Sequence, residues 1–464
     1  MDRREFLKKI GIGASVTGLA LAGCDSKDNK IIKDNRTGGN VSKGKMTYRT
    51  NSSTGDRVSL LGYGCMRWPM TPSPDGNGEV IDQETVNHLV DYAIEHGVNY
   101  FDTAPPYMRG LSETATGIAL ARHPRNKYFI ATKLSNMSFH REGMRGRELY
   151  DASVEMYKRS FKNLQTDYID YYLLHSIGGG EGIKTVNERF FDCGLIDFLK
   201  KEREEGRIRN LGFSYHGDVK AFDYLLSLHD DIHWDFCQIQ LNYVDYRHAS
   251  GANYNAEYLY DELSKRGIAA VVMEPLLGGR LATLNRHLNG QLKSREPENS
   301  IASWAFRFSG TFPDVLTVLS GMTYMEHLQD NILTYSPLVP LNDEELEMLE
   351  DTAVKFVSFP TVPCNACDYC MPCPYGINIP AIFTHYNKCI NDGNIPSSSK
   401  DKEYEKARRA FLIGYDRSVP KLRQASHCIG CGQCVPECPQ TIDIPARLHQ
   451  IDKYVENLKR DFQV

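Results

Sequence analysis

The chain has 464 residues, of which 41% are apolar and 24% are charged, and its formal net charge is −5. This length leaves room for more than one domain, and the composition is typical of soluble globular proteins. The mild acidity excludes the strongly basic class of nucleic-acid binders, so we expect no nucleic-acid partner. No segment is long and apolar enough for a transmembrane helix in the mature protein.

The first 23 residues have the pattern of an export signal. Residues 1–9 are basic, and residues 10–22 form a weakly apolar stretch too short to span a membrane. Arg3-Arg4 followed by Phe6-Leu7-Lys8 resembles the twin-arginine export signal, and Leu21-Ala22-Gly23-Cys24 resembles a bacterial lipoprotein processing box. These resemblances imply export of the folded protein, lipidation of Cys24, and a cell-envelope location on the periplasmic side of a membrane, attached through the lipid anchor only. The alternative is a disordered basic tail.

Residues 24–45 are polar and predict a solvated tether. From residue 46 to residue 341, short apolar runs alternate with amphipathic stretches. The apolar runs predict eight strands, at 59–66, 99–103, 128–134, 169–175, 208–215, 236–242, 268–275 and 316–322. The stretches between them predict eight helices, at 83–96, 113–121, 147–164, 195–205, 219–228, 256–266, 300–308 and 325–332.

Eight strands alternating with eight helices indicate an α/β fold, and specifically a (β/α)8 TIM barrel. A doubly wound open sheet is the alternative, but no G-x-G-x-x-G pattern follows an early strand. In a (β/α)8 barrel, the chemistry sits at the carboxyl ends of the strands. Four ionisable residues fall at the ends of the second, third and fourth strands and could face one cavity: Asp102, Tyr107, Lys133 and His175.

Several motifs in this region resemble the aldo/keto reductase family. They are Phe101-Asp102-Thr103-Ala104 with Tyr107, Ser112-Glu113, Ala131-Thr132-Lys133, the run from Asp170 to His175, and Asn210-Leu211-Gly212-Phe213-Ser214. The resemblance covers residues 46–340 in order and implies hydride transfer between NAD(P)H and a small carbonyl or sugar substrate.

The resemblance also implies a role for each of the four ionisable residues. Tyr107 would be the acid that protonates the developing alkoxide. Because a free tyrosine has a pKa near 10, the Lys133 cation would lower that pKa, and Asp102 would keep the lysine charged and in place. His175 would stabilise the carbonyl oxygen as a hydrogen-bond donor.

The cofactor contacts implied by the resemblance match less completely. Ser214 and Gln238 correspond to residues that bind the nicotinamide carboxamide, Met273 falls where a side chain stacks on the ring, and Arg280 would pair with the pyrophosphate. Gly321 and Asn331 lie in the segment 320–331, where members that prefer NADP carry Lys or Arg for the 2′-phosphate. This segment has neither. We therefore expect weak NADP preference, use of NAD, or no dissociable nicotinamide.

Two cysteine runs follow the barrel region. The second is a C-x2-C-x2-C-x3-C-P run, the spacing by which bacterial ferredoxins hold iron–sulfur clusters, whereas the first has two residues before its fourth cysteine. In two-cluster ferredoxins the cysteine before proline ligates the other cluster. We therefore expect two 4Fe-4S clusters, one held by Cys364, Cys367, Cys370 and Cys438, and the other by Cys373, Cys428, Cys431 and Cys434. A single cluster, a zinc site or a disulfide scaffold would be the alternatives.

The remaining boundaries follow from these motifs. Residues 342–357 predict a connecting helix, residues 358–445 a small ferredoxin-like 4Fe-4S domain, and residues 446–464 an amphipathic helix that packs this domain onto the barrel. The insert 391–409 is polar and charged. Cys389 has no motif and is interpreted as a packed thiol.

Two functional hypotheses remain. The first is a membrane-anchored reductase or dehydrogenase whose clusters either connect it to an external electron donor or acceptor protein or only support the structure. The second is an iron–sulfur electron-transfer or docking lipoprotein whose barrel no longer uses a dissociable nicotinamide. The difficulty for the first is that a hydride carries two electrons whereas each cluster exchanges one, and no flavin motif is evident.

Overall fold

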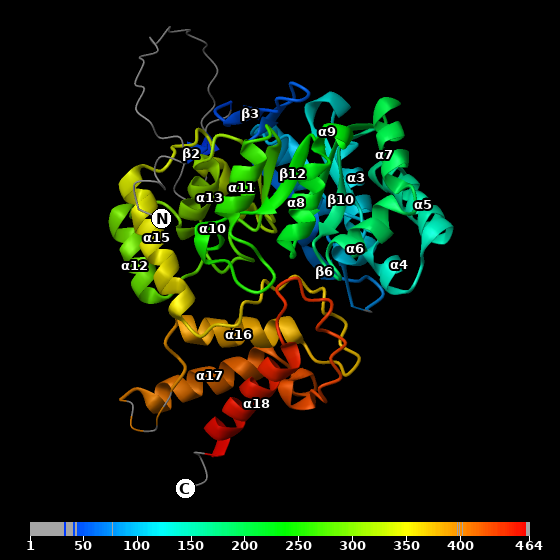
Figure 1. The fold of residues 1–464 in the computed structure, drawn as a ribbon. Coiled ribbons are helices and arrows are strands. Elements are labelled where there is room, and N and C mark those ends of the chain that lie inside the picture. The colour runs from blue at the N-terminus through cyan, green and yellow to red at the C-terminus, as the bar shows by residue number, and fades with distance from the viewer. Residues whose placement is uncertain are drawn as a thin grey trace, which may run out of the picture. The chain divides into compact units, whose positions relative to one another are not determined.

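The computed structural model of the chain describes residues 44–76, 78–396, 398, 400 and 402–460, and the backbone of two paired strands, β1 (Ile32–Lys33) and β2 (Asn40–Val41). The predicted export signal, its lipidation residue Cys24 and most of the tether lie outside these residues. The chain forms two compact units (Figure 1). The first comprises residues 1–242, 254–275 and 306–346, and the second comprises residues 243–253, 276–305 and 347–464. No helix in the described part of the chain is long and apolar enough to cross a membrane.

The first unit is built on a closed barrel of eight parallel strands, so the predicted (β/α)8 architecture is confirmed. The strands follow one another around the barrel in chain order, and the last strand pairs with the first to close it. They are β5 (Leu61–Gly64), β8 (Tyr100–Asp102), β9 (Phe129–Leu134), β10 (Ile169–Ile177), β11 (Ile208–Tyr215), β12 (Phe236–Gln240), β13 (Ala269–Met273) and β14 (Val315–Ser320).

The barrel interior is filled with aromatic and aliphatic side chains. Tyr171 meets Tyr100 and Phe236 edge to face, with ring centroids 5.0 and 5.2 Å apart. Such contacts are favourable because the positive edge of one ring faces the negative face of another. Burial on both faces explains why these strands appear in the sequence as continuous apolar runs and do not alternate with polar residues.

A hairpin precedes the barrel strands and was not predicted from the sequence. It pairs β3 (Tyr48–Thr50) with β4 (Arg57–Ser59). Its loop supplies Asp56, which accepts a hydrogen bond of 3.0 Å from the hydroxyl of Tyr171, and Asn51, which donates one of 3.0 Å to Asn210. These polar groups lie near the amino ends of β10 and β11, so the hairpin satisfies buried polar atoms there.

The helices of the first unit follow the predicted pattern closely. In α5, Leu149, Ser153, Tyr157, Ser160 and Leu164 are buried at spacings of three and four residues, as expected for one face of a helix. The predicted helices correspond to α2 (Gln83–Glu95), α3 (Ser112–Leu120), α5 (Gly146–Leu164), α7 (Leu195–Glu204), α8 (Val219–Ser227), α11 (Ala256–Ser264), α13 (Ile301–Thr311) and α14 (Met325–Thr334).

The structure also contains short elements outside the predicted pattern. A second hairpin joins β6 (Met70–Pro72) and β7 (Glu79–Ile81). The additional helices are α4 (Met137–Arg141), α6 (Ile183–Val186), α9 (His229–Ile232), α10 (Asp245–His248) and α12 (Arg286–Arg295). The helix α15 (Asp343–Ser358) matches the predicted connecting helix.

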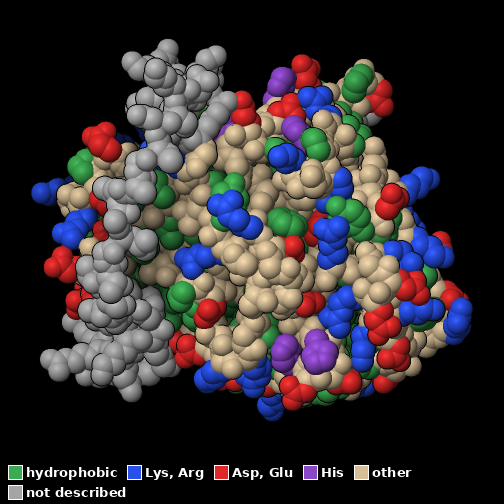
Figure 2. All heavy atoms as spheres, turned by 90° about the horizontal axis from the view of Figure 1, so that it is seen from above, with side chains coloured by type: hydrophobic (Ala, Val, Ile, Leu, Met, Phe, Trp, Pro, Cys, Tyr) green, Lys and Arg blue, Asp and Glu red, His purple; other side chains and the backbone are tan. Residues whose placement is uncertain are grey.

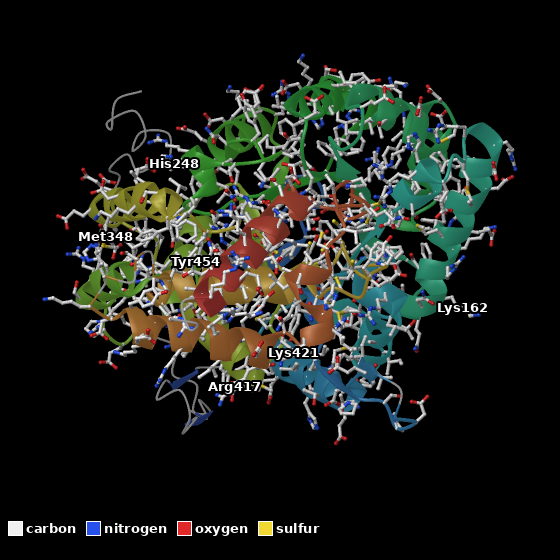
Figure 3. All side chains as sticks on the ribbon, turned by 90° about the horizontal axis from the view of Figure 1, so that it is seen from below. Lys162, His248, Met348, Arg417, Lys421 and Tyr454 are labelled. Atoms are coloured by element: carbon white, nitrogen blue, oxygen red, sulfur yellow. The ribbon has the colours of Figure 1, made fainter. Side chains whose placement is uncertain are left out.

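The second unit packs three helices around its own apolar core: α16 (Ile379–Asn391), α17 (Tyr404–Ser418) and α18 (Ile444–Arg460) (Figures 1 and 3). Phe383 from α16, Phe411 from α17 and Val455 from α18 are buried in that core. The apolar face of α18 therefore packs within the cluster-bearing unit, whereas the sequence led us to expect it to attach this unit to the barrel. Several cluster cysteines pack against the same core: Cys364, Cys370, Cys373, Cys428, Cys434 and Cys438.

Candidate active site and cluster sites

The structure brings the four ionisable residues of the barrel together. Asp102 ends β8, Lys133 lies near the end of β9 and His175 lies near the end of β10. Tyr107 begins η2 (Tyr107–Gly110), the turn that follows β8. Neighbouring parallel strands place their carboxyl ends at one rim of the barrel, so three separate segments of sequence meet there.

Lys133 and Asp102 form a buried ion pair. The ammonium Nζ of Lys133 donates to Oδ1 of Asp102 at 2.5 Å and to the carbonyl oxygen of Thr103 at 2.8 Å. Burial lowers the pKa of Lys133 and raises the pKa of Asp102, and the attraction between the two charges opposes both shifts. The pair therefore holds a cation at a fixed point in a site of low dielectric.

The ring of Tyr107 lies close to this cation and to His175. The Lys133 Nζ is 4.9 Å from the centroid of the Tyr107 ring. The Tyr107 and His175 rings meet edge to face, with centroids 6.0 Å apart and planes inclined by 79°. Tyr107 is half-buried, and the next two residues, Met108 and Arg109, have positive φ values of 53° and 58°. This uncommon left-handed backbone turns the chain sharply after Tyr107.

His175 is buried, and it is held once at its ring and once at its backbone. Its Nδ1 is 2.6 Å from the hydroxyl oxygen of Ser135, and its backbone carbonyl accepts a hydrogen bond of 2.7 Å from Arg189. Burial, followed by the nearby Lys133 cation, lowers the pKa of His175 well below the ordinary value. The imidazole is therefore neutral at physiological pH, with Nδ1 engaged by Ser135.

Two residues predicted to contact the nicotinamide lie at the same rim. The Ser214 hydroxyl oxygen accepts a hydrogen bond of 2.9 Å from the backbone N–H of Ser176. The Nε2 of Gln238 lies 3.5 Å from Oδ2 of Asp102, whereas Oε1 of Gln238 is buried and has no hydrogen-bond partner among the described residues. A buried acceptor without a protein partner fits a ligand that presents an N–H donor, as a carboxamide does. Met273, at the end of β13, is only half-buried.

The segment after β14 carries Gly321 and Asn331. Asn331, on α14, is buried and donates a hydrogen bond of 3.0 Å to the Ser320 hydroxyl. Gly321 is exposed, and a Cβ atom placed on it would lie 3.3 Å from Cδ of Arg67. Arg67, which ends the turn after β5, thus brings a cation beside a segment that has none of its own.

Arg280 belongs to the second unit. Its guanidinium donates a hydrogen bond of 3.0 Å to the Thr361 hydroxyl and lies 4.9 Å from the centroid of the Phe356 ring. The residue predicted to pair with a pyrophosphate therefore contacts the segment that leads into the first cysteine run.

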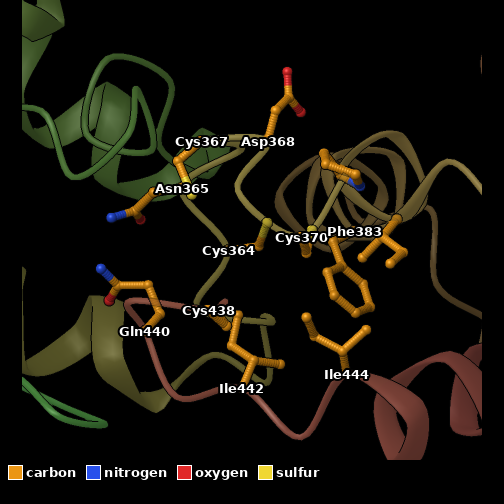
Figure 4. A pocket seen from close by; sticks show the side chains of 12 residues that line it. Cys364, Asn365, Cys367, Asp368, Cys370, Phe383, Cys438, Gln440, Ile442 and Ile444 are labelled. Carbon is orange, nitrogen blue, oxygen red and sulfur yellow. The ribbon is translucent and has the colours of Figure 1, made fainter. Parts of the chain in front are cut away.

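Four cysteines surround one hollow in the second unit, and they are the first predicted set: Cys364, Cys367, Cys370 and Cys438 (Figure 4). The hollow is partly open to solvent, and Phe383, Ile442 and Ile444 line its apolar side. Among the described residues, no three His, Cys, Asp or Glu side chains converge closely enough for a single metal ion. Four thiols at separated corners of a hollow fit the ligand set of a 4Fe-4S cluster.

The second predicted set is also brought together. The thiols of Cys373, Cys428 and Cys431 lie close enough to Cys434 to raise its pKa electrostatically, in addition to the larger effect of burial, to about 11. This set is more open than the first, because Cys431 is exposed. Cys389, by contrast, is buried in the core and its Sγ lies 3.5 Å from Nε2 of His385, as expected for a packed thiol.

The profile of the Aldo/keto reductase family matches residues 60–353, which is more than half of the chain. The chain belongs to the aldo/keto reductase family. It is therefore an oxidoreductase. L-galactose dehydrogenase from Arabidopsis thaliana is 26% identical over 332 residues, covering 67% of this chain and 94% of that protein.

Two solved aldo/keto reductases share the fold. The holo form of AKR11C1 from Bacillus halodurans has a TM-score of 0.50 and 23% identity, covering 66% of this chain and 96% of its own. The thermostable Tm1743 has a TM-score of 0.51 and 21% identity, covering 66% of this chain and 99% of its own.

This aldo/keto reductase carries a second recognisable region. The profile of the 4Fe-4S dicluster domain matches residues 363–444, which include both cysteine sets. An iron–sulfur domain therefore follows the reductase barrel.

The structure adds residues to the reductase site that the motifs did not reveal. His216 follows β11, and its ring Nδ1 is buried without a partner among the described residues. Burial, followed by the Lys133 cation, lowers the pKa of His216 to about 4. Ser135, Arg189 and Arg67 are the other additions. The only sequence signal for Ser135 and His216 was their position just past a predicted strand.

Proposed function

We propose that this protein interconverts a carbonyl and an alcohol at a nicotinamide bound to the barrel. The observation that carries the proposal is the buried Lys133–Asp102 ion pair next to the ring of Tyr107, with neutral His175 beside it. The bound nicotinamide would supply or accept the hydride.

Tyr107 is assigned as the proton donor to the developing alkoxide. A tyrosine is a poor acid at neutral pH, and a cation fixed nearby favours its phenolate. Lys133 is such a cation, and its two hydrogen bonds, to Asp102 and to Thr103, keep it from approaching the substrate itself. When the Ser135 hydroxyl donates to Nδ1 of His175, Nε2 carries the ring proton and donates to the carbonyl oxygen.

The experiment that tests this assignment is Tyr107→Phe. We expect the variant to lose carbonyl turnover by about a thousandfold while its iron content and cluster spectrum stay unchanged. Turnover equal to that of the wild type would remove Tyr107 from the role of acid. A screen of aldehydes, ketones and aldoses, including L-galactose because of the dehydrogenase relative, would provide the substrate for this assay.

Use of NAD(P)H is supported by the unpartnered Oε1 of Gln238 and by Ser214 at the same rim. Arg67 would be the cation available to an adenosine phosphate near Gly321. Titration of the anaerobic protein with NADH and with NADPH tests this, and Arg67→Ala should weaken NADPH binding more than NADH binding.

The proposal includes two 4Fe-4S clusters, one for each cysteine set, and a role for them in one-electron exchange with an external protein. The support is that the structure groups the cysteines into two sets of four, one containing Cys370 and the other containing Cys434. Roughly eight iron atoms per chain would agree with two clusters, and roughly four would limit the protein to one.

A second candidate function is favoured by two observations. Arg280 contacts Thr361 and Phe356, and the segment 320–331 has no Lys or Arg. In this alternative the barrel binds no dissociable nicotinamide, and the protein is an electron-transfer or docking lipoprotein. Absence of both NADH and NADPH binding in the titration above would favour it.

We further propose export by the twin-arginine route and attachment to the periplasmic side of a membrane through lipid on Cys24. The support is the sequence of residues 1–24 alone. Cys24→Ser should release the protein from the membrane fraction.

A further inference from the structure

We propose that the surface around the second cysteine set is the docking site of a small acidic protein that carries single electrons. We call this surface the Cys431 face. It consists of Cys431, four exposed apolar residues and three cations: Tyr375, Leu422, Ile429, Val435, Arg417, Lys421 and Arg423. The inference rests on the proposed function in one respect, namely that this set holds a cluster.

The first observation is the difference in exposure between the two cysteine sets. Cys431 is exposed, whereas all four cysteines of the first set are partly buried. Electron transfer between proteins needs a redox group close to the surface, so the second set is the suitable point of entry.

The second observation is the apolar surface on the same segments. Leu422 is 80% exposed, Ile429 64%, Tyr375 47% and Val435 37%. Single exposed apolar residues need no explanation. Here, however, Ile429 and Val435 alternate with the cysteines of the run, and Tyr375 lies two residues after Cys373.

Hydrogen bonds connect these segments. Arg423 donates to the carbonyl oxygen of Gly376 at 3.2 Å, and its own carbonyl accepts from the N–H of Asn378 at 3.0 Å. The turn η5 (Lys421–Arg423), which presents Leu422, therefore lies beside the loop of Tyr375. Tyr375 and Leu422 thus lie on adjoining segments, while Ile429 and Val435 lie within the second cysteine run itself.

The third observation is the charge of this region. From residue 416 to residue 437 there are three cations, Arg417, Lys421 and Arg423, and two acidic residues, Asp416 and Glu437, one at each end of the segment. Arg417 and Lys421 are labelled together in the view of Figure 3. This contrasts with the whole chain, whose net charge is −5, and with the face in Figure 2, where basic and acidic side chains are interspersed. A cationic rim around an apolar centre selects an acidic partner and steers its approach.

The step at this face changes no bond. One electron passes from the reduced cofactor of the partner to the group held by Cys373, Cys428, Cys431 and Cys434. The partner is oxidised by one electron, that group is reduced by one, and no proton is transferred at the contact. Redox encounters of this kind use small interfaces.

The experiment uses the anaerobic, cluster-loaded full chain and two probes, a small acidic two-cluster ferredoxin and a basic cytochrome c. Binding is measured by biolayer interferometry at low and high salt, and electron transfer by stopped-flow absorbance. We expect the acidic probe to bind about tenfold or more tightly than the basic probe at low salt, with an advantage that falls as salt rises. Equal binding of the two probes, or no binding of the acidic probe, would overturn the proposal.

Matched variants locate the contact. Ile429→Glu, Leu422→Glu and Lys421→Glu should each weaken binding of the acidic probe by about tenfold. The controls are Ile118→Glu, because Ile118 is 39% exposed on α3 of the first unit, and Lys453→Glu on α18. Leu422 lies outside the cysteine run, so its substitution leaves the ligands in place. Equal losses in the variants and the controls would refute the assignment of the face.

Two further readouts on the same samples separate this inference from the proposed function. Electron paramagnetic resonance reports whether the clusters are intact, and nicotinamide-linked turnover reports on the barrel. Intact clusters and normal turnover with no loss of binding in the face variants contradict the inference alone. Docking that depends on the face in a protein without turnover contradicts the proposed reductase activity alone.

Discussion

The barrel site and the cluster sites differ in how their polar and reactive side chains are satisfied. In the barrel, the charges of Asp102 and Lys133 neutralise each other, and Ser135 and Arg189 hold His175. In the second unit, cysteine side chains from both runs pack against a core to which three helices contribute most of the buried residues. The barrel therefore provides a nearly complete site from its own side chains, whereas the second unit is completed by what its cysteines bind.

This difference makes the two units unequal in their dependence on cofactors. Domains with small cores usually need metals or disulfides to fold stably, because they bury too little apolar surface. Among the described residues, the cysteines form no disulfide. The second unit should depend on iron, and the barrel should not.

Iron removal is the strongest way to test this comparison. Chelation under anaerobic, reducing conditions should abolish the protection of α16, α17 and α18 from amide hydrogen exchange, while the strands from β5 to β14 keep theirs. The measurement is hydrogen exchange followed by mass spectrometry. Retained protection in the three helices would show that their apolar core is sufficient without iron.

The ion pair allows a second test, on the barrel side. Lys133→Met leaves the Asp102 carboxylate buried without its cation and should destabilise the protein by about 3–5 kcal/mol. Adding Asp102→Asn should restore much of that stability but not the turnover. Chemical denaturation and steady-state kinetics on the single and double variants measure the two effects separately. A double variant with wild-type turnover would contradict the assigned role of the cation.

His216, which follows β11, should make the stability of the protein depend on pH. The pKa of His216 is about 4 in the folded protein, below the value of about 6.5 for a free histidine, so between these values the unfolded chain binds a proton that the folded chain does not. His216 should therefore lower the stability of the protein as the pH falls from about 6.5 to about 4, by at most about 3 kcal/mol.

His216→Gln should remove this part of the pH dependence, measured by denaturation at several pH values. The matched control is His88→Gln, on the exposed face of α2. If both variants keep the pH dependence of the wild type, the buried imidazole has no part in it.

The smallest expected effect concerns the support of His175. Ser135→Ala removes the hydroxyl that engages Nδ1 and should lower kcat by about tenfold with little change in KM. Ser135→Thr, which keeps the hydroxyl, should recover most of the rate. A change in KM alone would place Ser135 in substrate binding instead.

Much of the barrel and its site was predictable because the signals are local. Burial on both faces gives each strand an apolar run, and the family motifs place Asp102, Tyr107, Lys133 and His175 just where those runs end. The spacing of the cysteines likewise predicted which four would meet in each set. Ala366 and Asp368 in the first run even share the positive φ of Gly430 and Gly432 at the corresponding positions of the second.

Contacts between distant segments explain what the sequence did not predict. Arg67 meets Gly321 only because β5 and β14 are neighbours in the closed barrel. Only the first six residues of α17 fall in the predicted polar insert 391–409, and no helix was predicted there. Its buried face is marked by Ala407, Phe411 and Tyr415, among others. The grouping of residues 243–253 and 276–305 with the cluster region has no local signal.

That grouping limits how this protein can be divided. In the second unit, Asn253 donates a hydrogen bond of 2.9 Å to Gln440, and a Cβ atom on Gly278 would lie 2.5 Å from the Cα of Asn365. Two loops that belong to the barrel in the sequence are thus built against the cluster-bearing segment in three dimensions. A gene truncated after the reductase region would encode these loops without the surface that shapes them. The iron–sulfur region therefore cannot be separated from the reductase region without losing part of its own unit. A fusion of this region to another reductase would have to include both loops.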